Sequence, residues 1–151
     1  MSGKNPYSTA AGAYGATAAA TDQRALEGKI LMKAAMRLED LAKRIKAGEK
    51  PTLDEIGETM EYNQKLWTVF VAEAMNEEHP LPQNVKNNIA SLGLFVFKRT
   101  KEVLIDTTPE KIATLVDINR NIAAGLMKQV KSETPQAAPV KDKSSATDSL
   151  A

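Results

Sequence analysis

Few side chains in this sequence are suited to chemistry. His79 is the only histidine among the 151 residues, and the chain contains no cysteine. A metal site or a nucleophilic centre needs a second ligand or a paired base, and the Pro-flanked stretch around His79 offers neither. The adjacent carboxylates Asp54 and Glu55 open a helix, where negative charge favours the positive end of the helix dipole. We therefore expect no enzyme activity, no metal and no cofactor.

Two asparagines on otherwise apolar helix faces form a second kind of candidate. Asn63 shares a face with Trp67 and Phe70, and Asn119 lies among leucines and isoleucines. A buried amide without partners costs about 1 to 3 kcal/mol, so each must pair across helices or face a binding groove. We predict that Asn63 contacts the segment 117–120 and fixes the register of the two helices. We expect the aromatic pair to lie in the core, as aromatic residues at helical spacing usually do.

The apolar periodicity of the chain predicts an all-α fold, a small bundle of about four main helices. The first is expected over residues 22–47, with Asp22 as its N-cap. The second opens with a capping box, the third begins at about Pro82, and the fourth has Thr108 as N-cap and frays near Gly125. Gly93, in the middle of the third helix, is expected to mark a helix crossing. The predicted inward stripes are Leu26, Ile30, Ala34, Leu38, Leu41 and Ile45; Ile56, Met60, Asn63, Trp67, Phe70 and Ala74; Val85, Ile89, Leu92, Val96, Val103 and Leu104; and Ile112, Leu115, Asn119, Ile122 and Leu126.

Composition divides the chain into three parts. Residues 1–21 are rich in alanine and are expected to form a weak, docked helix, because Gly12 and Gly15 each cost about 1 kcal/mol of helix stability. Residues 22–131 form the predicted helical domain. Residues 132–151 have almost no large apolar side chain and cannot offset their chain entropy, so they are expected to be a disordered tail.

The charge pattern bears on the partners of the protein. A net charge of +1 does not indicate a nucleic-acid binder, which usually carries a basic excess. A basic stripe of Lys29, Lys33 and Arg37 could meet RNA phosphates, although a solvated helix face explains it equally well. No run approaches the ~18 apolar residues that a membrane span requires, and the lack of cysteine suits a reducing compartment. We expect a cytoplasmic protein without a membrane span.

Four blocks of the sequence resemble the FlaF family, the flagellar biosynthesis regulators of alphaproteobacteria. The similarity extends over residues 7–127 and includes Arg24 and Glu27 in the first long helix. The blocks, called the family blocks below, are Asn63-x-x-Leu66-Trp67-x-x-Phe70, Leu81-Pro82, Ser91-Leu92-Gly93-Leu94-Phe95-Val96, and Leu115-Val116-Asp117-Ile118-Asn119-Arg120-x-Ile122-x-x-Gly125-Leu126.

The resemblance implies a non-enzymatic protein that promotes flagellin production or secretion by chaperone-like binding of flagellin, together with or against an FlbT-type regulator. Flagellin's terminal segments are amphipathic helices that need a groove for their apolar face. Two alternatives stay open, namely a post-transcriptional regulator acting on flagellin mRNA and an amphipathic helical protein that coats granules. The residues carried over as partner-binding or fold-defining are Asn63, Leu66, Trp67, Phe70, Ser91, Leu92, Gly93, Phe95, Asp117, Asn119 and Arg120.

Overall fold

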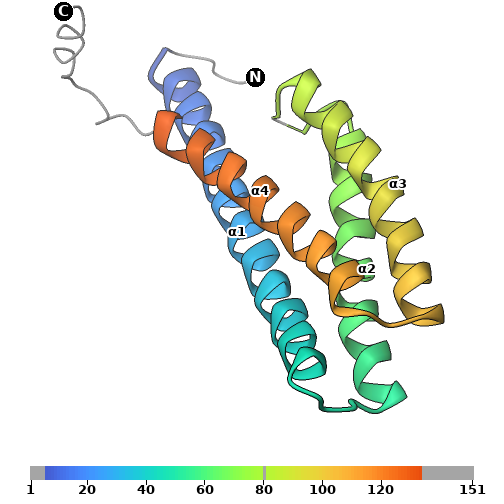
Figure 1. Ribbon diagram of the computed structural model, residues 1–151. Helices are drawn as coiled ribbons and strands as arrows, with labels where there is room; N and C mark the ends of the chain where they lie inside the picture. Colours follow the sequence, from blue (N-terminus) through green and yellow to red (C-terminus); the bar gives the residue numbers. More distant parts are fainter. Residues whose placement is uncertain (1–5, 80, 134–151) are drawn as a thin grey trace, which may run out of the picture. The chain divides into compact units, whose positions relative to one another are not determined.

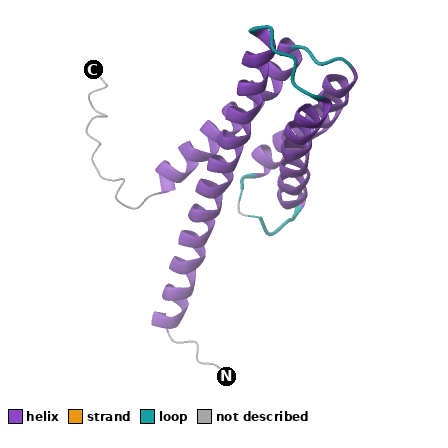
Figure 2. Ribbon diagram, turned by 90° about the horizontal axis from the view of Figure 1, so that it is seen from below, coloured by secondary structure: helices purple, strands orange, loops and turns teal. Residues whose placement is uncertain are grey.

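The computed structural model describes residues 6–79 and 81–133, and within them the side chains of residues 21–79 and 81–128. Four helices account for nearly all of this part of the chain: α1 (Pro6–Lys46), α2 (Leu53–Met75), α3 (Gln83–Ile105) and α4 (Pro109–Glu133) (Figure 1). Short loops connect them, and these residues contain no strand (Figure 2). The predicted all-α fold is confirmed. No helix in this part of the chain is long and apolar enough to cross a membrane.

The helix boundaries correct two predictions. Asp22 lies inside α1 and does not begin a helix, because the alanine-rich stretch before it continues the same helix from Pro6. Alanine has the highest helix propensity, which outweighs the cost of the two glycines in this stretch. Similarly, α4 continues past Gly125 to Glu133 and does not fray at the glycine. The predictions for residues 1–5 and for the tail beyond residue 133 lie outside the described residues.

The described residues divide into two compact units, one within residues 6–29 and 123–133 and the other within residues 30–122. In the first unit α1 and α4 approach closely at Gly28, where an added Cβ would lie 3.0 Å from Sδ of Met127. Ala123 and Leu126 are buried there. Arg24 and Glu27 are also buried, and Gln23 donates a hydrogen bond of 3.1 Å to the carboxylate of Glu27.

The second unit contains the main core, built from residues 30–46 of α1, from α2 and α3, and from residues 109–122 of α4. Each helix contributes one inward stripe. The buried apolar residues of this unit are Leu31, Ala34, Ala35, Leu38, Leu41, Ile56, Met60, Trp67, Phe70, Ala74, Leu81, Ile89, Val96, Val103, Ile112, Leu115 and Val116.

The predicted stripes agree with the buried faces to different degrees. All six residues predicted for α2 are buried, and Gly93 marks a helix crossing as predicted, because a Cβ at this position would overlap Cγ2 of Val71. On α1 the prediction is partly wrong, since Leu26 is 53% exposed while Leu31 and Ala35 are fully buried. On α3 the prediction fails at Leu104, which is 52% exposed.

Polar side chains hold the helix ends of the second unit. Thr52 caps α2 by accepting the backbone N–H of Glu55 at 3.1 Å, which confirms one half of the predicted capping box. The carboxylate of Glu55 instead receives Nη2 of Arg44 at 2.7 Å. Hydrogen bonds to Glu55 and then to Glu49 raise the pKa of the Arg44 guanidinium above its usual value. The loop between α1 and α2 is thus held by a cation that stays charged at any ordinary pH.

The two residues directly after α2 are held by a buried lysine that was not predicted. Lys86, in the first turn of α3, donates from Nζ to the backbone carbonyls of Asn76 at 2.8 Å and Glu77 at 3.3 Å. Carbonyls at a helix C-terminus lack intrahelical partners and carry partial negative charge. A lysine ammonium can therefore be buried at this position because these carbonyls compensate its charge.

Candidate functional site

A chain of buried hydrogen bonds joins α1, α2 and α4 in the centre of the second unit. Nε1 of Trp67 donates to Oδ1 of Asn119 at 2.8 Å. Nδ2 of Asn119 donates to Oδ1 of Asn63 at 2.8 Å and approaches the carbonyl of Leu31 at 3.5 Å. The predicted contact between Asn63 and the segment 117–120 is thereby confirmed. We call Asn63, Trp67 and Asn119 the amide network.

The amide network has only one consistent orientation. An indole N–H can only donate, so the oxygen of Asn119 must face Trp67 and its nitrogen must face Asn63. All three side chains are fully buried. Nδ2 of Asn63 is buried as well and has no hydrogen-bond partner among the described residues. The positions of α2 and α4 are thus fixed by directional bonds in addition to apolar packing, as expected of polar groups that set helix register.

The other residues carried over from the resemblance divide between the core and the surface. Phe70 is buried and meets Trp67 edge to face, with ring centroids 5.4 Å apart, and Gly93 is buried at the helix crossing. Leu66, Leu92 and Phe95 are half-buried, and the Arg99 guanidinium lies over the Phe95 ring at 5.1 Å. The surface residues of the set are Ser91, Asp117 and, half-exposed, Arg120.

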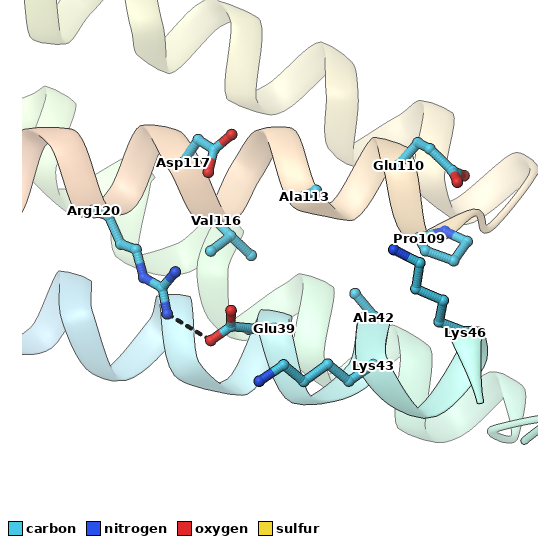
Figure 3. Close-up of a pocket in the computed structure, with 10 residues that line it drawn as sticks. All are labelled: Glu39, Ala42, Lys43, Lys46, Pro109, Glu110, Ala113, Val116, Asp117 and Arg120. Atoms are coloured by element: carbon cyan, nitrogen blue, oxygen red, sulfur yellow. Dashed lines mark hydrogen bonds and ion pairs between the residues drawn. The ribbon is translucent and has the colours of Figure 1, made fainter.

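Asp117 and Arg120 line a pocket of about 280 Å³ between α1 and α4, which we call the α1/α4 groove (Figure 3). Its apolar lining consists of Ala42, Pro109, Ala113 and Val116, and its charged lining consists of Glu39, Lys43, Lys46, Glu110, Asp117 and Arg120. All of these residues belong to the second unit. The groove is therefore a small apolar surface between two charged helix edges.

One ion pair crosses the α1/α4 groove. Nη2 of Arg120 lies 2.5 Å from Oε1 of Glu39, and Figure 3 shows the two side chains pointing toward each other from α4 and α1. Both side chains keep partial exposure, 41% and 32% respectively. An exposed pair of this kind contributes only ~0.2 to 1 kcal/mol to stability. The pair therefore contributes little to folding.

Sequence reasoning missed most residues of the α1/α4 groove. Glu39, Lys43 and Lys46 follow one another at helical spacing, as do Glu110, Ala113 and Asp117. This periodicity is visible in the sequence, but exposed charged rows occur on every helix. Only the packing of α1 against α4 shows that the two rows face a common groove.

The basic stripe proposed for RNA is only partly free. Arg37 lies over the ring of Tyr62 at 4.3 Å, an arrangement typical of a cation–π contact between α1 and α2. Lys29 and Lys33 are exposed. A shallow hollow beside this stripe is lined by Lys33, Met36, Arg37, Asp40 and Thr59. It carries an acidic residue among the basic ones, so it is not a uniformly positive surface.

The fold and the site together define an all-helical protein whose core is held by an amide network and whose surface carries a charged groove. The family model of the flagellar protein FlaF matches residues 10–126. The chain belongs to the FlaF family. Comparison with curated proteins and with solved structures gives no match.

Proposed function

We propose that this protein is a non-enzymatic, cytoplasmic flagellar biosynthesis protein that binds flagellin in a chaperone-like manner and so promotes its synthesis or secretion. Membership of the FlaF family supports a flagellar role. An FlbT-type regulator is a further proposed partner. Binding, as opposed to catalysis, is the kind of activity that the described side chains suit best.

The observation that carries the proposal is the position of Asp117 and Arg120. Among the residues carried over from the resemblance, five are buried, and the amide network and Gly93 account for four of them through the fold. Asp117 and Arg120 instead lie at the edge of the α1/α4 groove, where their side chains contribute little to the stability of the fold. A groove with an apolar base and charged edges suits the apolar face of an amphipathic helix. The terminal segments of flagellin, expected to be such helices, fit this recognition mode.

The test is to fill the groove without disturbing the core. Ala113 is exposed at the groove, and Ala72 is exposed on α2 away from it. We expect Ala113→Trp to weaken binding of purified flagellin by about tenfold or more while the melting temperature stays that of the wild type. Ala72→Trp, the matched control, should bind flagellin normally. If the wild-type protein does not bind flagellin in isothermal titration or co-elution, the proposed function is wrong.

The alternative of direct action on flagellin mRNA makes a separate prediction. RNA binding through phosphate contacts would fall steeply with salt and would need Lys29, Lys33 and Arg37. Because Arg37 is engaged by Tyr62, we expect the triple alanine variant to leave flagellin mRNA levels unchanged. A loss of mRNA control in this variant, with flagellin binding intact, would favour the alternative.

A further inference from the structure

The two edges of the α1/α4 groove carry opposite charge. On the α1 edge are Lys43 and Lys46, and on the α4 edge are Glu110 and Asp117. All four side chains are exposed, and none forms an ion pair within the described part of the chain. The one ion pair that crosses the groove, between Arg120 and Glu39, has no net charge. The groove therefore presents a positive wall and a negative wall to an occupant.

The base of the groove suits a helix more than a small molecule. Ala42 and Ala113 are small, so the backbone of another helix can approach closely over them, and Val116 offers an apolar contact. The volume of about 280 Å³ falls at the lower limit of pockets that enclose small ligands. The stretch from Pro109 to Arg120 is about 16 Å long, or about three helical turns. This length fits a short amphipathic helix that places apolar side chains in the pocket.

We propose that the α1/α4 groove binds one amphipathic helix in a direction set by charge, with its acidic flank along Lys43 and Lys46 and its basic flank along Glu110 and Asp117. A helix that lies apolar face down exchanges its left and right flanks when it is turned end for end. Only one of the two directions therefore matches both walls. The identity of this helix as a flagellin segment rests on the proposed function; its charge pattern and direction rest on the groove.

The direction of the bound helix can be read by cross-linking. The native chain has no cysteine, so one introduced thiol is unique. Ala47→Cys places it near the Lys46 end of the groove, and Asn121→Cys places it near the Arg120 end; both positions are exposed. The probes are two synthetic amphipathic peptides of equal composition and identical apolar face, with acidic and basic flanks exchanged. Each carries one cysteine at its N-terminus, and disulfide formation under mild oxidation is measured with each protein variant.

We expect each peptide to cross-link to one end in preference to the other by about tenfold or more, and the two peptides to choose opposite ends. A third peptide with glutamine on both flanks should cross-link to both ends alike. Reversing the walls with Lys43→Glu, Lys46→Glu, Glu110→Lys and Asp117→Lys in each cysteine variant should exchange the preferred ends. The control Glu61→Lys with Lys65→Glu, an exposed pair on α2, should change nothing. Equal cross-linking of all peptides at both ends would overturn the inference.

Binding of intact flagellin separates this inference from the proposed function. If flagellin binds the wild type and the four-charge variant with equal affinity, the proposed function is supported, but the inference that the charged walls orient the bound helix is wrong. If the peptides choose ends as expected and flagellin does not bind, the groove is a directional helix site and the proposed partner is wrong. Folding of each variant is checked by circular dichroism, and the exposure of all four positions predicts native helix content.

Discussion

Asn119 and Arg120 are neighbours on α4, yet they belong to two different regions of the molecule. Asn119 is fully buried and bonds to Trp67 and Asn63, whereas Arg120 reaches over the α1/α4 groove to Glu39. Substitutions in the amide network should change folding free energy, because buried polar groups cannot replace lost partners with water. Substitutions in the groove should change binding, because exposed charges contribute little to stability. On the proposed function, one family block therefore holds both a fold determinant and a binding residue.

Removal of the Trp67 ring should have the largest effect on this comparison. Trp67→Ala leaves a large cavity and an unpaired Asn119 oxygen, so we expect a loss of about 3 to 5 kcal/mol of unfolding free energy. Urea denaturation followed by circular dichroism measures it. Val69→Ala, which changes a side chain that is 56% exposed on the same helix, is the control. A Trp67→Ala protein of native stability that loses flagellin would make the first family block, residues 63–70, a binding surface.

The register-fixing role of the amide network is tested by Asn63→Leu. This change leaves Asn119 Nδ2 with only the long contact to the Leu31 carbonyl, and we expect a loss of about 1 to 3 kcal/mol. Gln64→Leu adds the same side chain at the next, exposed position and should be nearly neutral. The hypothesis is wrong if Asn63→Leu melts at or above the wild type and still binds flagellin.

Two glycines form a matched pair that tests the helix crossing. At Gly93 a methyl group would collide with Val71, whose branched side chain has little rotamer freedom, so Gly93→Ala should cost about 1 to 3 kcal/mol. At Gly57 an added Cβ meets nothing within 4 Å. Gly57→Ala should therefore stabilise the protein by up to about 1 kcal/mol through helix propensity. Val71→Ala combined with Gly93→Ala should recover part of the loss. Thermal melts of the three variants measure these differences, and a Gly93→Ala protein as stable as Gly57→Ala would contradict the close crossing.

The smallest stability effect is expected in the groove. Arg120→Ala should cost less than about 1 kcal/mol, because both members of its ion pair are partly exposed. Lys65→Ala, which breaks the exposed pair with Glu61, should cost as little. Only the first variant should lower the affinity for flagellin in titration calorimetry. If both variants bind equally well, Arg120 does not belong to the binding surface.

The sequence was most informative where one face of a helix is sharply apolar. On α2 all six predicted residues are buried, and the pairing of Asn63 with the segment 117–120 followed from the high cost of an unpaired buried amide. On α1 two neighbouring stripes are both apolar enough to be buried. The buried face combines Ala34, Leu38 and Leu41 of the predicted stripe with Leu31 and Ala35 beside it, and residue periodicity alone could not find this combination.

Other features depend on residues that are distant in the sequence. The hydrogen bond from Trp67 to Asn119 joins positions 52 residues apart, and the indole N–H by itself gives no indication of its acceptor. The α1/α4 groove also depends on distant residues, since its walls come from the first and the last helix in the sequence. Local patterns therefore predict which residues are buried more reliably than they predict which surfaces meet.

The buried lysine at the end of α2 has a consequence for the connection between α2 and α3. Lys86 joins the carbonyls of Asn76 and Glu77, directly after α2, to the first turn of α3, so the separation of these two segments is set by a side chain of fixed reach. The residues between them need only close a gap whose width is already determined. Between Glu77 and the buried Leu81, this connection can therefore accept changes of length that would be harmful in a loop that had to set the helix spacing itself.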